Sequence, residues 1–409
     1  MLNVVVLNGG RGAASLISAL LGRQGLHVTS VINAYDDGKS TGDIRRLFGM
    51  LGPSDIRKVQ ELMLPDDDPD YPTHRHIFRY RFPLDVVDAE AKARLAEFAR
   101  GDRDDLVGFS PLRPKVRAAL QTCLVEFLTG LHAIEAISGE RLHFADCSLM
   151  NCLYAGAFLA CRRNIERATM FFDRLFKLRG TVLPTSIENK VLVALRENGQ
   201  MLYSEAEIVE LRSNVRIERL YMLDQPLDRA RFEGLSQDEK RYYLDRHHGY
   251  VEVSPGVRLA LRQADIVLYA AGTQHSSLYP TYMSAGLAQS IADNRAAFKV
   301  FVTNIGADYE TPRYQASDYL KGAHRYLNLA DSRHYTMPEL FDAVLVNQSR
   351  FKADETYVDY DEDGFADVPV RLILDVFESA AAPGRHDGEK LVQAVLDLYE
   401  AASDRRGMS

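Results

Sequence analysis

Three glycines within four positions follow an apolar run in the stretch VVVLNGGRGAAS, residues 4–15. They are Gly9, Gly10 and Gly12. Glycines let backbone N–H groups approach an anion, and a helix that starts near Ala13 would point the positive end of its dipole at the same place. The loop therefore indicates either a phosphate-binding turn or an ordinary tight turn between a buried strand and a helix.

The spacing of this loop departs from the common nucleotide motifs. It is GxGxxS, and no acidic residue stands about 20 positions further on at a strand end, as a dinucleotide site requires. It is also not GxxxxGK[ST]. A dehydrogenase is therefore a weak alternative, and so is a P-loop enzyme.

Paired carboxylates stand in the second candidate stretch, NAYDDGKSTGDIRR (residues 33–46). Asp36 and Asp37 could hold Mg²⁺ through oxygen ligands, or take a proton from an attacking hydroxyl. Lys39 and Ser40 follow in a small polar loop whose donors suit phosphate. The alternative is an Asp-Asp-Gly turn capped by hydroxyl side chains.

A helix start is expected in GPSDIRKV, residues 52–59. Asp55 could be no more than its N-terminal cap. Arg57 and Lys58 are less expected in a first turn, because cations there oppose the helix dipole. Such a local violation is typical of functional sites.

The stretch AAGTQHSSLYPT, residues 270–281, repeats the opening order of strand, glycine and helix. Gly272 ends the strand, and Thr273 and Ser277 offer donors to a phosphate or a sugar. His275 is more often structural than catalytic in such a setting. We therefore expect the loop, rather than the histidine, to contact a ligand.

The elements that must position these residues alternate between strands and helices. Helices are expected over 13–21 and 282–294. Apolar runs predict strands buried on both faces, as in a parallel sheet, over 2–8, 27–33, 264–272, 299–306 and 341–349. The fold class is therefore α/β, with a Rossmann-like, doubly wound, mostly parallel sheet and helical insertions. Its site should lie at the carboxyl ends of the strands.

The chain is expected to form a single domain over 1–409. Within it, 66–145 is predicted to be a mainly helical insertion and 226–250 a charged surface insertion. The stretch 188–208 predicts a hairpin around ENGQ, and 385–405 a C-terminal helix.

Composition limits the partners. The net charge of −8 argues against a nucleic-acid binder. The four cysteines form no CxxC pair, and we expect them to be free thiols. No leader-like segment is recognised, and no apolar run approaches the roughly 20 residues of a membrane span. We expect a cytoplasmic protein, with a homodimer as the default assembly.

Several motifs together resemble one family, the CofD-like (UPF0052-type) superfamily of 2-phospho-L-lactate transferase and the gluconeogenesis factor. The second branch fits better, because DDGKSTG resembles its Asp-Asp-Gly-Gly-Ser-Ser-Gly pattern. The segments that carry the resemblance are LNGGRGAASLISAL, AYDDGKSTGDIRR, LGPSDIRKV, NCLYAGAF, RGTVLPTSIENKVLVA, ADIVLYAAGTQHSSLYPTYMSAGLAQSI and TPRYQASDYL.

The resemblance implies a nucleotide or nucleotide-sugar ligand. It implies either a Mg²⁺-dependent transferase, which moves a phosphoryl-linked group from a nucleoside-diphosphate-activated donor to an acceptor hydroxyl, or a non-catalytic UDP-sugar-binding regulator of carbon metabolism and cell-envelope homeostasis. Asp36 and Asp37 would be catalytic and metal-binding. The residues implied in ligand binding are Gly9, Gly10, Arg11, Gly12, Lys39, Ser40, Asp55, Arg57, Asn151, Gly272, Thr273 and Ser277.

Four positions depart from the family pattern. Arg11 stands in place of Thr, Lys39 of Gly, Lys58 of Asn and Met150 of Gly. Three of the four changes add a cation. They suggest a ligand that carries more negative charge than those of either branch.

Overall fold

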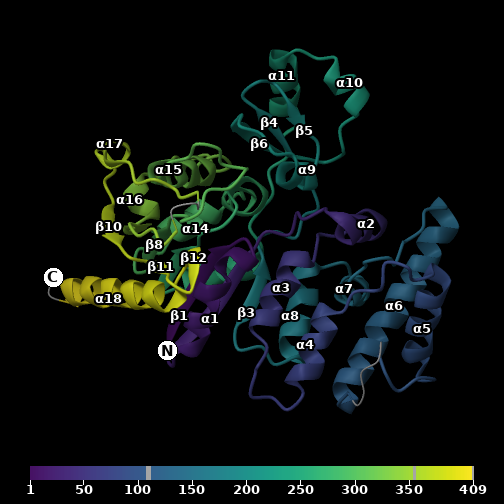
Figure 1. Cartoon of the computed structure of the whole chain (residues 1–409). Coiled ribbons are helices and arrows are strands. Elements are labelled where there is room, and N and C mark those ends of the chain that lie inside the picture. Colours follow the sequence, from purple (N-terminus) through teal and green to yellow (C-terminus); the bar gives the residue numbers. More distant parts are fainter. Residues whose placement is uncertain (107–111, 353–355, 408–409) are drawn as a thin grey trace. The chain divides into compact units, whose positions relative to one another are not determined.

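The structure, a computed structural model, describes residues 1–106, 112–352 and 356–407, and the side chains of Arg11 and Arg406 lie outside the described part. The chain forms two compact units, labelled by their elements in Figure 1. The first unit combines Met1–Asn33 with Lys190–Ser409, and the second is Ala34–Asn189. The single domain over 1–409 stays a prediction.

The first unit begins with β1 (Leu2–Asn8), a 3-10 turn at Arg11–Ala13, α1 (Ala14–Gly22) and β2 (Leu26–Ile32). Its later elements, in chain order, are β4 (Val191–Arg196), β5 (Met201–Leu202), α9 (Glu205–Glu210), β6 (Ile217–Leu223), α10 (Arg229–Glu233), α11 (Gln237–His247), α12 (Pro255–Arg262), β7 (Ile266–Tyr269), the π-helix η2 (Gln274–Leu278), α13 (Tyr279–Tyr282), α14 (Leu287–Asp293), β8 (Phe298–Val302), α15 (Ala316–Leu327), α16 (Met337–Leu340), β9 (Ala343–Asn347), α17 (Glu362–Phe365), β10 (Arg371–Asp375), β11 (Glu378–Ser379), β12 (Ala382–His386) and α18 (Gly388–Gly407).

The main sheet of the first unit has the strand order β10-β9-β8-β7-β1-β2, and every neighbouring pair in it is parallel. From β1 the chain moves to β2 on one side, whereas β7 to β10 follow on the other side. The order of the strands therefore reverses between β1 and β7. In open α/β sheets, ligands bind at such a switch point, beyond the carboxyl ends of the strands.

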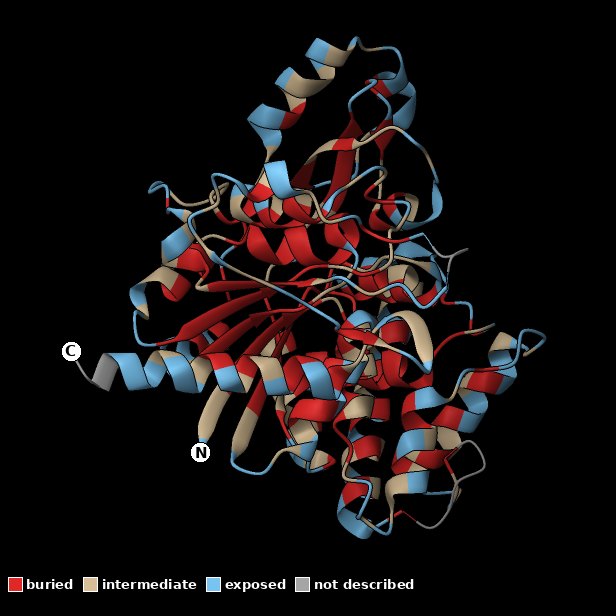
Figure 2. Ribbon diagram, turned by 60° about the vertical axis from the view of Figure 1, so that its left-hand side comes forward, coloured by how far each residue is buried: buried red, intermediate tan, exposed pale blue. Residues whose placement is uncertain are grey.

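Burial explains why these sequences form central strands. Val4 to Leu7 of β1 and all four residues of β7 are buried, as the red strands of Figure 2 show. A strand with both faces covered must be apolar at every position. Helices lie on both faces of the sheet in Figure 2, and α18 packs against α1. This confirms the predicted α/β fold with a parallel sheet.

One predicted helix, 282–294, is wrong as a continuous element. The chain leaves helical geometry after Tyr282 and resumes it at Leu287. Between them the backbone of Ala285 pairs with Val251 and Val253, and Gly286 takes the left-handed conformation at φ +81°. These tertiary bonds interrupt the helix that the apolar spacing favours. Strand β10 was also not anticipated.

A smaller antiparallel sheet, β5-β4-β6, forms next to α11 in the first unit. Its β4–β5 turn lies at the predicted ENGQ hairpin, with Gly199 at φ +82°. The predicted charged insertion, 226–250, contains α10 and α11, whose buried residues are Phe232 and Leu244. These two side chains attach otherwise exposed helices to the unit.

The second unit is built mainly of helices. They are α2 (Lys39–Phe48), α3 (Ser54–Leu62), α4 (Tyr71–Arg79), α5 (Asp88–Arg100), α6 (Pro114–Ser138), α7 (Leu149–Ala160) and α8 (Ile165–Leu175), followed by the strand β3 (Thr181–Pro184). Three of them, α4 to α6, lie within the predicted helical insertion.

Helix α6 is the one helix, among those described, that is long and apolar enough to cross a membrane. The expectation that no apolar run approaches that length was therefore too strict. One face of α6, including Leu120, Leu124 and Phe127, is buried, and the helix packs against α5 and α7. We interpret α6 as an amphipathic helix whose buried face packs into the second unit.

Candidate functional site

The glycine loop turns tightly at the carboxyl end of β1. Gly10 adopts φ +90°, which a residue with a side chain rarely takes, and its N–H donates to Asn8 Oδ1 at 3.1 Å. Asn8 is itself held, because its Nδ2 donates to Ser30 Oγ at 2.7 Å. The sequence change from apolar strand to Asn8 thus has a structural role: it fixes the turn.

Gly9 is required by close packing within the first unit, and Gly12 lies in tight contact with the loop after β7. A Cβ atom on Gly9 would lie 2.5 Å from Ser277 Cβ. A Cβ on Gly12 would lie 3.2 Å from Gly272 Cα and 3.3 Å from the carbonyl oxygen of Ala271. Both predicted glycine loops, 9–12 and 272–277, therefore meet at the switch point.

The same turn leaves backbone donors available. Within the described chain, the N–H groups of Gly9 and Gly12 donate to no protein acceptor. The nine-residue helix α1 begins at Ala14 without a side-chain cap. A helix start with open N–H groups favours an anion. The Arg11 side chain, which was expected to add a cation here, lies outside the described residues.

Asn304 holds the second loop in place. Its Oδ1 accepts from the N–H of Gly272 and its Nδ2 donates to the carbonyl of the same residue, both at 2.9 Å. Asn304 follows β8 by two residues, so a neighbouring strand end sets the position of the loop that follows β7.

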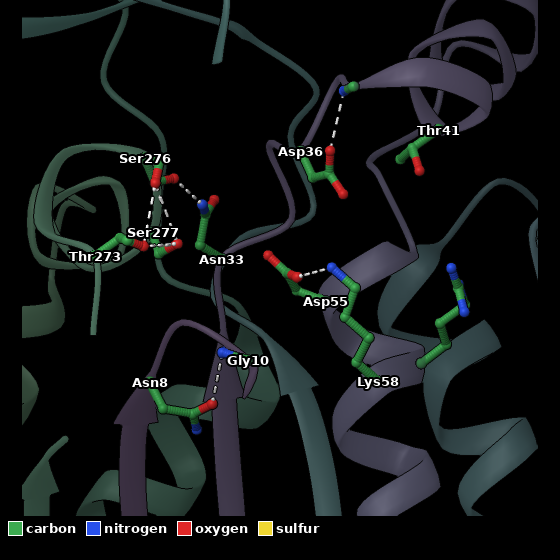
Figure 3. A network of polar contacts seen from close by, with 12 residues as sticks. Asn8, Gly10, Asn33, Asp36, Thr41, Asp55, Lys58, Thr273, Ser276 and Ser277 are labelled. Atoms are coloured by element: carbon green, nitrogen blue, oxygen red, sulfur yellow. Dashed lines mark hydrogen bonds and ion pairs between the residues drawn. The ribbon is translucent and has the colours of Figure 1, made fainter. Parts of the chain in front are cut away.

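Three hydroxyl groups form a cluster in this loop (Figure 3). Thr273 Oγ1 and Ser277 Oγ lie 2.8 Å apart, and Ser276 Oγ lies 3.2 Å from Thr273 Oγ1. Asn33, directly after β2, donates from Nδ2 to the carbonyl of Ser276 at 2.8 Å. Ser276 and Ser277 are buried, whereas Thr273 is exposed. The cluster thus reaches from the interior to the surface.

His275 is only a weak base in this loop. It is buried, and desolvation lowers its pKa to about 3, so that it is neutral. The residue that sequence reasoning missed is Glu310, whose carboxylate accepts from the N–H groups of His275 and Ser276, each at 2.9 Å. Its one signal in the sequence is an acidic residue in the loop after a predicted strand.

In the second unit, Asp36 holds the turn that precedes α2. Its Oδ1 accepts from the N–H of Gly38 at 3.0 Å, the bond drawn at the top of Figure 3. The carbonyl oxygen of Asp37 would lie 2.1 Å from a Cβ on Gly42, so that this turn packs closely on the helix. Both aspartates are half-buried.

Asp55 shares the electrostatic environment of Asp36. Burial raises the pKa of Asp55, the Lys58 charge lowers it, and the charge of Asp36 raises it further. The Lys58 ammonium lies 2.8 Å from Asp55 Oδ1 (Figure 3). The carboxylate pair that interacts electrostatically is therefore Asp36 with Asp55, together with a built-in cation.

Asn151 meets Ser40 and Thr41 at the N-terminus of α2. Asn151 is buried, with Nδ2 3.4 Å from Ser40 Oγ and from Thr41 Oγ1. Its buried Oδ1 has no hydrogen-bond partner in the described structure. Lys39 adopts φ +47°, and its ammonium lies 3.5 Å from Asp146 Oδ2. A buried amide oxygen without a partner calls for an explanation, and a ligand would provide one.

Arg57 acts on Asp55 through its charge, which lowers the pKa of that carboxyl. It is buried, and its Nη1 donates to the carbonyl of Phe78 at the end of α4, at 3.2 Å. Its position in the first turn of α3 therefore has a packing reason. No cluster of three or more His, Cys, Asp or Glu side chains suited to a metal is found among the residues described.

Comparison with known proteins shows the family of this chain. The family model for 2-phospho-L-lactate transferase CofD matches residues 4–380. The chain belongs to the CofD family. This chain is 24% identical over 403 residues to the gluconeogenesis factor of Listeria monocytogenes. The alignment covers 97% of this chain and 95% of the relative. It is 23% identical over 399 residues to that of Halalkalibacterium halodurans, covering 97% and 96%.

A solved structure shares the CofD-family fold. A crystal structure of a UPF0052 family protein from Bacillus halodurans superposes with a TM-score of 0.67 at 19% identity, covering 97% of this chain and all of that one. The resemblance expected from the motifs is thereby confirmed at the level of family and fold.

Proposed function

We propose that this CofD family member is a transferase that moves a phosphoryl-linked group from a nucleoside-diphosphate-activated donor to an acceptor hydroxyl. The observation that carries the proposal is the open pair of N–H groups at Gly9 and Gly12, in front of the uncapped start of α1. Their place at the switch point of the sheet suits a diphosphate. Phosphoryl transfer needs mainly positioning and charge stabilisation, which such a loop supplies.

Mg²⁺ is the cofactor that the proposal requires, and the second unit offers oxygen ligands for it. Asp36 and Asp55 fit, because the charge of Asp36 raises the pKa of Asp55 and a divalent cation would oppose that effect. Mg²⁺ would neutralise charge on the transferred group. Asp37 stays a prediction as a third carboxylate.

A second candidate function is binding without turnover, by a nucleotide-sugar-dependent regulator. The ion pair between Lys58 and Asp55 favours it, because an ammonium already supplies positive charge at the carboxylate pair. The relatives are named gluconeogenesis factors, which agrees with a role in carbon metabolism. For either function we propose a cytoplasmic protein, with a homodimer as the assembly to test.

A thermal-shift panel tests the shared part of both proposals. Ligands of the UDP-sugar, GDP and GTP types and deazaflavins are each added with and without Mg²⁺. A ligand that binds the folded state must raise the melting temperature. A rise with at least one nucleotide supports the proposal, and the absence of any rise contradicts both functions.

Two conservative variants separate the functions. Asp55→Asn should abolish turnover and the effect of Mg²⁺ in a transferase, while ligand binding persists. Asp37→Asn should likewise lower turnover and spare binding, and Asp43→Asn is the matched control, because the carboxylate of Asp43 pairs with Arg46 at 3.2 Å on the surface of α2. Absence of turnover in wild type, with equal ligand affinity of Asp55→Asn and wild type, would favour the regulator.

A further inference from the structure

An exposed aromatic ring stands in the loop that follows β8. Tyr309 is 56% exposed, and the guanidinium carbon of Arg212 lies 4.0 Å from the centre of its ring. Both residues belong to the first unit, and neither belongs to the motifs discussed above. A cation this close to the ring centre is attracted by the electrons of the aromatic face.

A second arginine–tyrosine stack, between the same two segments, has an internal role. The guanidinium carbon of Arg216 lies 4.8 Å from the ring centre of Tyr314. Arg216 also donates to the carbonyls of Pro312 and Arg313, at 3.3 and 2.6 Å. Its Nη2 lies 3.2 Å from Asp318 Oδ2. This stack therefore ties the segment before β6 to the loop after β8.

The stack of Arg212 on Tyr309 has no such further contacts. In the part of the chain that the structure describes, the ring is the only partner of the Arg212 side chain, and the Tyr309 hydroxyl has none. Arg212 therefore keeps an uncompensated positive charge beside an exposed aromatic surface. Aromatic rings and guanidinium planes are the two protein surfaces on which nucleic acid bases stack.

The backbone that carries Tyr309 is fixed on both sides. Asp308 Oδ1 accepts from the N–H groups of Glu310 and Thr311, at 2.8 and 3.1 Å. The Glu310 carboxylate accepts from two backbone N–H groups of the π-helix η2, each at 2.9 Å. The loop therefore presents the ring in a preorganised position, which lowers the entropy that a ligand must overcome on binding.

The same bonds bring Tyr309 to the edge of the sheet that carries the glycine loop. Glu310, its neighbour in the chain, accepts from Ser276 Oγ at 2.6 Å. The next residue, Ser277, packs directly on Gly9. A nucleotide whose phosphates lie at the glycine loop has its base at the other end, and the flat face of a base can stack on an aromatic ring.

We propose that Tyr309, backed by Arg212, is the surface on which the base of the bound nucleotide stacks. This deepens the proposed function and rests on it. The base lies on the part of the ring that Arg212 leaves exposed. Since every base has a flat π-face, the ring supplies affinity for a nucleoside without selecting its base. UDP and GDP should therefore both gain from it, whereas inorganic pyrophosphate should not.

A fluorescence titration tests the stacking directly. The chain contains no tryptophan, so Tyr309→Trp introduces a single indole at the proposed surface. UDP and GDP should quench its emission, and inorganic pyrophosphate should leave it unchanged. Tyr242→Trp is the matched control, because Tyr242 is 64% exposed on α11 and also lies beside an arginine, Arg246, at 5.6 Å. Its emission should not respond to any of the three.

Calorimetry tests the contribution of the ring to affinity. Tyr309→Ala should bind UDP and GDP about tenfold more weakly than wild type, whereas Tyr309→Phe should bind them equally well. Pyrophosphate affinity and melting temperature should be the same in all three proteins, because the ring is exposed.

The outcomes separate this inference from the proposed function. Nucleotide binding that is equal in Tyr309→Ala and wild type, or quenching that is equal in the two tryptophan variants, would overturn the inference and leave the proposed function standing. A matching loss of pyrophosphate affinity in Tyr309→Ala would also overturn it, because the loop rather than the ring would then be responsible. Absence of nucleotide binding by wild type would contradict the proposed function itself, and the stacking surface with it.

Discussion

Gly9 and Ser277 lie so close that a Cβ atom on Gly9 would stand 2.5 Å from the Cβ of Ser277. Real Cβ atoms do not approach so closely, and neither partner can rotate away. The contact joins the loop after β1 to the loop after β7, the two strands that flank the switch point. Glycine at position 9 is therefore required whatever the ligand is.

Gly9→Ala should destabilise the protein by about 1–3 kcal/mol, because overpacking forces the two loops apart. Binding to nucleotides should be lost with it. Urea denaturation measures the change. Gly22→Ala is the control: no atom lies within 4 Å of its added Cβ, and it ends α1. That variant should be as stable as wild type or more stable, and equal stability of both variants would contradict the packing argument.

Lys39→Gly should stabilise the second unit by up to about 1 kcal/mol, because φ +47° is strained for lysine and free for glycine. Loss of the contact with Asp146 should cost little, since the lysine side chain is 75% exposed. Lys39→Ala keeps the strain and removes the charge. If the ammonium binds ligand, both variants lose affinity in calorimetry, but Lys39→Gly alone gains stability. A glycine variant less stable than the alanine variant would show that the strain argument is wrong.

Lys58→Met should raise the affinity for Mg²⁺ by about fivefold or more, because Asp55 then lacks its cation and still faces Asp36. Without Lys58 the pKa of Asp55 rises, so Mg²⁺ should also release more protons on binding. Calorimetry in two buffers of different ionisation heat measures both effects. Lys58→Arg keeps the charge and serves as the control. Unchanged Mg²⁺ affinity in Lys58→Met would show that the carboxylate pair is not a metal site.

Stability should depend on pH through Glu310. Its pKa is about 7 in the folded chain and near 4.5 when unfolded. Between these values the folded protein keeps the proton that the unfolded chain has lost, so the free energy of unfolding falls as pH rises from about 4.5 to 7. The fall is at most about 3 kcal/mol. Glu310→Gln should lack this part of the profile. Parallel profiles for the two proteins, measured by urea denaturation from pH 4.5 to 8, would refute the assignment.

The sequence by itself determined the fold class, the glycine loops and the family. Buried parallel strands are apolar at every position, and tight turns need glycine, so β1, β7, β8 and β9 and the turn at Gly10 can be predicted from local pattern. The ordered set of motifs then identifies the family, because each segment is short but their order is specific.

Tertiary structure alone decided which polar groups act together. Glu310 is bonded to Ser276, which lies 34 positions away in the chain. The charge of Asp36 acts on Asp55, which lies in the first turn of α3. Likewise Arg57 donates to the carbonyl of Phe78, and Ala285 breaks a helix to pair with Val251 and Val253. These hydrogen bonds and charge interactions join residues that are far apart in the sequence and at irregular spacing. A local sequence pattern therefore cannot predict them.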